Sequence, residues 1–171
     1  GLLSSGEQST LLFNLLGVIL YQKGSLEEAV STFKRGISLD PSSADSYCNL
    51  AKTLSDLGRT DDALSNCKKA IKLNPRLAEA HNTLGVVQGK LGRNQEALAS
   101  YNRAIELNPG LLDAHANRGS CLVELDELLD ALAVYNKLIE LKPDVAKYYF
   151  SRGEIQVKLE LLDSALASFE K

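Results

Sequence analysis

Apolar residues along this chain recur at helical spacing, in pairs of short stretches separated by polar turns. In residues 44–77 the first apolar series follows the spacing i, i+3, i+4, i+7: Tyr47, Leu50, Ala51 and Leu54. This spacing places one apolar stripe along a helix. Gly58 then tolerates the positive φ of a tight turn. A second apolar series follows: Ala63, Leu64, Cys67, Ala70 and Ile71. The pattern predicts two amphipathic helices joined by a turn.

The same pattern returns every 34 residues. This period separates all four prolines: Pro41, Pro75, Pro109 and Pro143. It also separates a series of small residues: Gly17, Ala51, Gly85, Gly119 and Gly153. One helix pair cannot bury its own apolar face, so the copies must stack on one another. The repeat predicts an all-α protein with units at 10–43, 44–77, 78–111, 112–145 and a shorter last one at 146–171. Residues 1–9 lack the pattern and are expected to be a linker or a remnant of other sequence.

The repeated residues resemble those of the tetratricopeptide repeat family. Residues 78–111 carry its pattern as follows: His81, Leu84, Gly85, Gln88, Gly92, Ala97, Tyr101, Ala104 and Pro109. The resemblance covers residues 10–171 and implies a right-handed α-solenoid of stacked antiparallel helix pairs. It also implies that the first helix of each unit lines a concave groove, which is where members of the family bind peptides.

Three positions depart from the family pattern. Asp126 and Glu160 replace the mid-repeat glycine, and Leu138 replaces a small residue, which predicts wider packing between units four and five. The last unit stops within its second helix and leaves an apolar face uncovered: Leu161, Leu162, Leu166 and Phe169. Because terminal repeats normally have a polar outer face, we expect self-association through this end.

Composition narrows the possible partners. The 171 residues include 19 Lys and Arg against 22 Asp and Glu, a net charge of −3, which argues against nucleic acid and anionic membranes as ligands. The most apolar run, residues 11–21, is interrupted by Asn14 and Gly17 and is too short to span a bilayer. The three cysteines form no CxxC pair. Their spacing argues against a disulfide framework or zinc site and for an intracellular, cytoplasmic location.

Residues that could carry catalysis are nearly absent. His81 and His115 occupy the same inward position as Tyr47 and Tyr149, so packing explains them better than acid–base or metal chemistry. A basic series recurs near the end of each second helix, where it complements the helix dipole: Arg35, Lys69, Arg103, Lys137 and Lys171. We expect no catalytic residue, no metal and no cofactor, and therefore a chain that is not itself an enzyme.

The candidate site is the groove that the resemblance implies. Positions two, five, six and nine of each unit share one face of the first helix, and they supply the predicted peptide-binding residues: Asn14, Val18, Asn49, Lys52, Asn82, Thr83, Val86, Asn117, Ser120, Lys147, Phe150 and Ser151. The sixth position is always small and polar in units two to five. An asparagine amide both donates and accepts, as gripping an extended peptide backbone requires. The alternative is that these groups only bond neighbouring helices.

Two known grooves of the family can be compared with this one. Asn49 and Asn117 are similar to the asparagine ladder in the repeats of O-linked N-acetylglucosamine transferases. The carboxylate clamp that holds chaperone tails requires lysines and an arginine, and here only Asn117 and Lys147 match it over units three to five. That partner is therefore not expected. Acidic residues at the second position favour neutral or basic ligands, although the helix dipole also explains them: Asp45, Glu79 and Asp113.

Three classes of function remain, in the following order. The first is a non-catalytic module that holds a peptide or an extended protein segment in its groove. The second is the substrate-recruiting array of a larger enzyme, such as a glycosyltransferase similar to those just named. The third is a structural spacer in an assembly, which would contact its partners through edges and ends.

Overall fold

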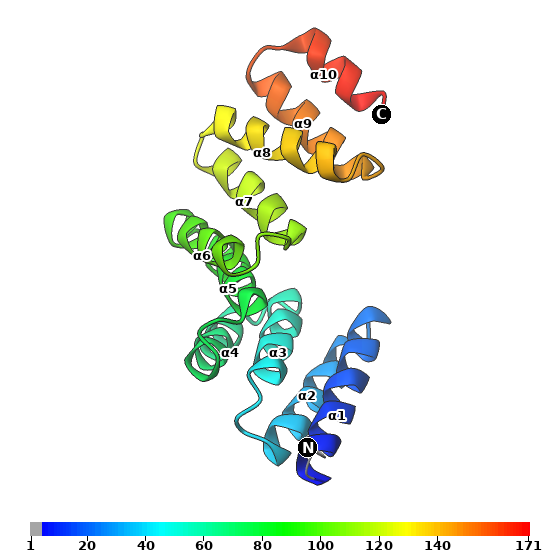
Figure 1. The fold of residues 1–171 in the computed structure, drawn as a ribbon, viewed down its shortest axis with the longest axis vertical. Coiled ribbons are helices and arrows are strands. Elements are labelled where there is room, and N and C mark those ends of the chain that lie inside the picture. Colours follow the sequence, from blue (N-terminus) through cyan, green and yellow to red (C-terminus); the bar gives the residue numbers. More distant parts are fainter. Residues whose placement is uncertain (1–4) are drawn as a thin grey trace.

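The protein is a curved array of helices. This computed structural model describes residues 5–171, with side chains from Ser9 onwards. The described part holds ten helices: α1 (Ser5–Gln22), α2 (Leu26–Leu39), α3 (Ala44–Asp56), α4 (Thr60–Leu73), α5 (Ala78–Lys90), α6 (Asn94–Leu107), α7 (Leu112–Glu124), α8 (Leu128–Leu141), α9 (Ala146–Lys158) and α10 (Leu162–Phe169). The array runs from α1 and α2 at one end to α9 and α10 at the other (Figure 1). The prediction of an all-α solenoid is confirmed.

The order of packing explains the curvature. Each helix contacts the next one in sequence, and each odd-numbered helix also contacts the next odd-numbered helix. Among the described residues, the even-numbered helices make no such contacts with one another. The odd-numbered helices therefore approach more closely and form the inner, concave face, as the family resemblance implied. The apolar side chains between the two rows form the core.

Close approach of the two helices within a unit depends on residue size. A Cβ atom on Gly85 would lie 2.6 Å from Cε1 of the Tyr101 ring. Unit two has the larger Ala51 at this position, but there the facing aromatic is replaced by Cys67, and both residues are fully buried in one cluster. The small residues of the repeat are thus matched to the ring that packs on them.

The turns within units all use a left-handed residue. Gly24, Gly58 and Gly92 have φ of 81°, 75° and 72°. Asp126 and Glu160 adopt the same conformation at 62° and 59°, at a cost of roughly 1–2 kcal/mol each relative to glycine. The turn is therefore retained where the sequence departs from glycine, because packing of the flanking helices fixes its geometry.

Both ends of the array, and the Leu138 position, depart from the regular repeat. Helix α1 begins at Ser5, so residues 5–9 extend it, whereas residues 1–4 of the expected linker lie outside the described residues. Leu138 is buried in the cluster that joins units four and five. The C-terminal apolar residues are between 46% and 66% exposed: Leu161, Leu162, Leu166 and Phe169. Self-association through them stays a prediction.

Candidate functional site

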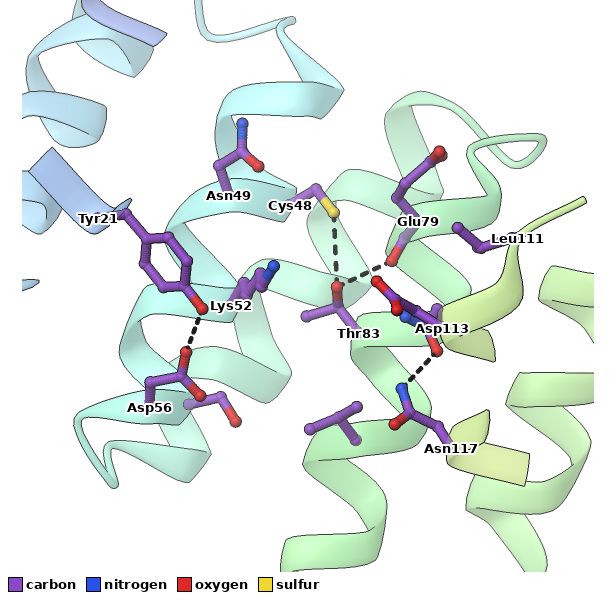
Figure 2. Close-up of a pocket in the computed structure, with 13 residues that line it drawn as sticks. Tyr21, Cys48, Asn49, Lys52, Asp56, Glu79, Thr83, Leu111, Asp113 and Asn117 are labelled. Atoms are coloured by element: carbon purple, nitrogen blue, oxygen red, sulfur yellow. Dashed lines mark hydrogen bonds between the residues drawn. The ribbon is translucent and has the colours of Figure 1, made fainter. Parts of the chain in front are cut away.

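A chain of adjoining depressions runs along the concave face. Their volumes are about 110 Å³ between α1 and α3, 310 Å³ over α1 to α7, 380 Å³ beside α5 and α7, and 240 Å³ between α7 and α9. Neighbouring depressions share lining residues, successively Asn49, Asn117 and Ser120. We call this chain of depressions the groove, and the 310 Å³ depression the central cavity (Figure 2).

Two asparagine pairs connect neighbouring helices along the groove. Nδ2 of Asn49 donates to Oδ1 of Asn14 at 3.0 Å, which joins α3 to α1. Nδ2 of Asn117 donates to Oδ1 of Asn82, also at 3.0 Å, which joins α7 to α5. Each pair uses one N–H and one carbonyl oxygen, so every one of these amides retains hydrogen-bonding capacity. The two roles expected for the asparagines therefore do not exclude each other.

The connection between α3 and α5 is different. Here Sγ of Cys48 lies 3.7 Å from Oγ1 of Thr83, and that hydroxyl donates to the backbone carbonyl of Glu79 at 2.8 Å. Because its only proton is already donated, Thr83 cannot also donate to a ligand. Burial raises the pKa of the Cys48 thiol to about 11. A thiol with this pKa is almost entirely protonated near neutral pH, which argues against nucleophilic chemistry in the groove.

At one end of the central cavity, the Asp56 carboxylate has partners within the chain. The Tyr21 hydroxyl donates to Oδ2 of Asp56 at 2.6 Å (Figure 2). Nζ of Lys90 lies 3.5 Å from the other carboxylate oxygen. Nζ of Lys52 lies 5.0 Å from the centre of the Tyr21 ring. Burial, followed by the hydrogen bond to Asp56, raises the pKa of Tyr21 to about 12. Asp56 and Lys90 therefore compensate each other, whereas Lys52 contacts only the neutral Tyr21 ring and makes no ion pair among the described residues.

The other end of the central cavity carries uncompensated negative charge. Glu79 and Asp113 line it, and neither makes an ion pair with any residue in the described part of the chain. Five carboxylates and three lysines line the groove as a whole: Asp56, Glu79, Asp113, Glu124, Glu154, Lys52, Lys90 and Lys158. The groove is thus acidic, most clearly near Glu79 and Asp113.

A buried hydroxyl in the central cavity has no partner. Ser55 lines the cavity and is 2% exposed, and its Oγ is the one buried side-chain polar atom without a hydrogen bond among the described residues. Its backbone carbonyl, by contrast, accepts from Nζ of Lys90 at 2.7 Å. Buried polar groups are normally paired, so this one requires an explanation.

Most of the predicted groove residues line the groove. Val18, Asn49, Lys52, Asn82, Thr83, Val86, Asn117, Ser120 and Ser151 line one or more of the depressions. Asn14 joins them through its bond to Asn49. Lys147 and Phe150 line none of the four depressions, and the Phe150 ring packs on Phe169 with centroids 5.6 Å apart. The role of all twelve predicted residues in binding a peptide stays a prediction.

Sequence reasoning missed four residues of the central cavity: Tyr21, Ser55, Asp56 and Leu111. Tyr21 and Ser55 share the twelfth position of their units and Asp56 follows at the thirteenth, whereas the predicted groove residues extend only to the ninth. One signal was available, because Tyr21 and Asp56 are 35 residues apart, the same offset as in the asparagine pairs. This offset joins one position of a unit to the following position of the next unit.

The histidines have local partners away from the groove. Nε2 of His81 lies 3.0 Å from the carbonyl oxygen of Pro75, and His115 makes the same contact with Pro109. Each histidine thus ties the start of its helix to the preceding turn. This geometry supports the packing role expected of them.

The repeated basic residues also have intramolecular partners. The cation of Arg35 lies over the ring of Phe13 and that of Lys69 over the ring of Tyr47. In the next two units the partners are glutamates, each 2.8 Å away: Glu106 for Arg103 and Glu140 for Lys137. These residues need no nucleic acid to explain them.

Two features are absent from the described residues. No helix there is both long and apolar enough to cross a membrane. No group of three or more histidine, cysteine, aspartate or glutamate side chains lies close enough together there to hold a metal ion.

Comparison with known families and structures gives a consistent result. A model described as TPR repeat matches residues 17–58, and two models described as tetratricopeptide repeat match residues 42–110 and, in overlapping matches, 83–146 and 117–171. No curated protein sequence matches the chain at a significant level.

Several solved structures are similar over most of this chain. A crystal structure of MamA is 30% identical, with a TM-score of 0.76 over 90% of both chains. A thermophilic TPR protein from Thermus thermophilus is 26% identical, with a TM-score of 0.82 over 93% of this chain and 87% of that one. YrrB, described as a TPR protein with an unusual peptide-binding site, is 24% identical, with a TM-score of 0.69 over 91% of this chain and 80% of its own. The last likeness shows the fold alone.

Proposed function

The chain belongs to the tetratricopeptide repeat family, and on this basis we propose that it is a non-catalytic scaffold that holds a peptide or an extended protein segment in its concave groove. Proteins of this fold generally bind other proteins. The observation that carries the proposal is the pair of asparagine contacts, Asn14–Asn49 and Asn82–Asn117, which leave amide groups available along a continuous groove. YrrB, with the same fold, is described as having a peptide-binding site.

The amides fit a backbone ligand for a geometric reason. The bond from Asn117 to Asn82 fixes both side chains, so their remaining donors and acceptors are held in place before a ligand arrives. An extended peptide presents donors and acceptors along its backbone whatever its sequence. The ladder can therefore supply binding without sequence preference, and the preference must come from other groups.

Hydrogen bonds alone do not supply enough affinity. Three of them contribute about 1.5–4.5 kcal/mol net, whereas a micromolar complex requires about 8 kcal/mol. Val18 and Val86 are half-buried groove residues that can add apolar contact. Two further sources are charge complementarity and a ligand long enough to follow several depressions.

The test is a comparative capture from lysate with two matched variants. Asn82→Ala/Asn117→Ala removes one asparagine pair from the groove. Asn66→Ala/Asn102→Ala removes two amides from α4 and α6 on the outer face. We expect proteins captured by the wild-type chain to be lost with the groove variant and kept with the outer-face variant.

The opposite result decides against the groove. If both variants, shown by circular dichroism to be as helical as the wild-type chain, retain the same captured proteins, the groove is not the binding surface. A role as a spacer that contacts partners through edges and ends then takes its place.

A further inference from the structure

We propose that the bound segment is basic, and that one of its lysine or arginine side chains is held at the Glu79 and Asp113 end of the central cavity. This inference rests on the proposed function of the groove and specifies its ligand. The observation behind it is the unequal distribution of charge within a single cavity of about 310 Å³.

Two lysines lie near this cavity: Lys52 on its wall, and Lys90 beside it, paired with Asp56. Lys90 pairs with Asp56 and donates to the Ser55 carbonyl, and Lys52 lies over the Tyr21 ring. Among the described residues, neither lysine forms an ion pair with Glu79 or Asp113, and these two carboxylates outnumber the one lysine on the cavity wall that has no carboxylate partner. These two carboxylates come from adjacent odd-numbered helices, α5 and α7, and line the same cavity (Figure 2). A cationic side chain from outside completes the charge balance that the chain itself leaves open.

The helix dipole does not account fully for the two carboxylates. Both lie in the first turn of a helix, where negative charge is stabilised. Asp61 and Asp130 lie in the first turns of α4 and α8 on the other row of helices and obtain the same stabilisation. What distinguishes Glu79 and Asp113 is their position on the wall of the cavity, beside the Asn82–Asn117 pair.

A second observation points independently to a ligand. The Ser55 hydroxyl is buried on the cavity wall without a hydrogen-bond partner in the described residues. A hydroxyl can donate to a carbonyl oxygen of a ligand backbone. A segment that places its cation near Glu79 and Asp113 and extends along the cavity has backbone carbonyls to offer Ser55, so one ligand satisfies both features.

The shape and charge of the groove favour a protein segment over other cations. A small inorganic cation would satisfy the two carboxylates but would leave the Ser55 hydroxyl and the remaining hydrogen-bonding capacity of the asparagine amides unused. Nucleic acid is disfavoured because carboxylates outnumber lysines along the groove. An extended basic segment matches the carboxylates, the amides and the hydroxyl together.

The experiment selects peptides from a phage-displayed library of random 12-residue sequences, using the whole chain as bait. A consensus peptide is then synthesised, together with a second version that carries glutamine in place of its enriched basic residue. Their binding is measured by fluorescence anisotropy to the wild-type chain, Glu79→Gln/Asp113→Asn, and Asp61→Asn/Asp130→Asn. The last variant loses two carboxylates from matching helix positions outside the groove.

The expected result is enrichment of lysine or arginine at a fixed position of the selected peptides. The consensus peptide should bind Glu79→Gln/Asp113→Asn at least tenfold more weakly and bind the Asp61→Asn/Asp130→Asn control as tightly as the wild type. The glutamine version should bind the wild type and the groove variant alike. Ser55→Ala should bind the consensus peptide severalfold more weakly than the wild-type chain does. The melting temperature of this variant should stay at or above that of the wild-type chain.

Three results overturn the inference, and they separate it from the proposed function. If the selected peptides lack a basic position but lose binding to Asn82→Ala/Asn117→Ala, the groove remains the binding site and the basic ligand is excluded. If the selected peptides bind Asn82→Ala/Asn117→Ala undiminished, or if no peptides are selected, the groove is excluded as the binding site as well. Equal weakening by both carboxylate variants would mean that net charge, not the cavity, attracts the peptide.

Discussion

The two halves of the groove share the same packing of helices but present different side chains to a ligand. From α1 to α7 the groove has two asparagine pairs, an uncompensated acidic end and a buried unpaired hydroxyl. From α7 to α9 the corresponding position holds Ala116 and Ser151, between which no hydrogen bond forms, while Ser120 bonds to the Tyr135 hydroxyl at 2.8 Å. The comparison teaches that a repeat fixes where groove residues lie, but not what they offer.

The reason is a difference in constraint. Close packing in the core links the sizes of residues that face each other. A glycine faces an aromatic ring, and where the larger Ala51 replaces the glycine, it faces Cys67 in place of a ring. Groove positions contact solvent or ligand and have no such requirement. Variation among them is therefore where the repeats can become specialised.

The largest expected effect on stability tests the helix packing that the two halves share. Gly85→Ala places a methyl group 2.6 Å from the Tyr101 ring, and overpacking of this kind costs about 1–3 kcal/mol, only partly offset by the roughly 1 kcal/mol gain in helix propensity. Gly119→Ala should cost less, because its methyl group would lie 2.9 Å from the Tyr135 ring. Urea unfolding of both variants measures the difference. Equal losses would mean that the two halves are packed equally tightly.

An alkaline shift should weaken the first half next. Burial raises the pKa of Cys48 to about 11 and that of Cys67 to about 12 from the ordinary value of 9.0. A raised folded pKa contributes stability below pH 9 that is lost as the pH rises towards these values. Between pH 7.5 and pH 10 we expect a loss of about 1 kcal/mol for each thiol.

The control for this prediction is Cys48→Ala. Its free energy of unfolding, measured across the same pH range, should fall by about 1 kcal/mol less than that of the wild-type chain. Identical falls for the two proteins would show that ionisation of Cys48 does not contribute.

A smaller effect distinguishes the connections within the first half. A double-mutant cycle of Asn82→Ala and Asn117→Ala should give a coupling energy of about 0.5–1.5 kcal/mol, the net value of one hydrogen bond. The same cycle on Cys48 and Thr83, whose sulfur and oxygen are 3.7 Å apart, should give less, because thiols are weak partners. Thermal unfolding of the wild-type chain and the variants of both cycles measures the two energies, and a reversed order would contradict the assignment of the asparagine pairs as the main polar links.

The smallest expected effect concerns the extent of the binding site. Lys147→Gln/Phe150→Ser changes the two predicted groove residues that line no depression, and peptide affinity should stay within about twofold of the wild-type value. Fluorescence anisotropy with the selected consensus peptide provides the measurement. A tenfold or greater loss would extend the binding site onto α9 and remove the contrast between the two halves.

From the sequence, the helical face could be assigned to the candidate residues, but their partners within the chain could not, and their role in binding a peptide stays a prediction. The helical face placed Asn49 and Asn82 correctly in the groove, because a side chain's direction follows from its place in the helix. The sequence could not show that Thr83 donates its proton to the Glu79 carbonyl, or that the Ser55 hydroxyl has no partner in the part of the chain that the structure describes. Those facts depend on distances between helices that are far apart in sequence.

The sequence by itself determined the helical units and their period, and the family resemblance indicated which row of helices faces the groove. Local propensity and the 34-residue repeat are sufficient for the units, since each unit contacts only its neighbours. Only the tertiary structure decided which polar groups pair across units, which depressions join, and where charge remains uncompensated. The physical reason is that hydrogen bonds and ion pairs form or fail over differences of less than an ångström, which the stacking of helices sets and a residue pattern does not.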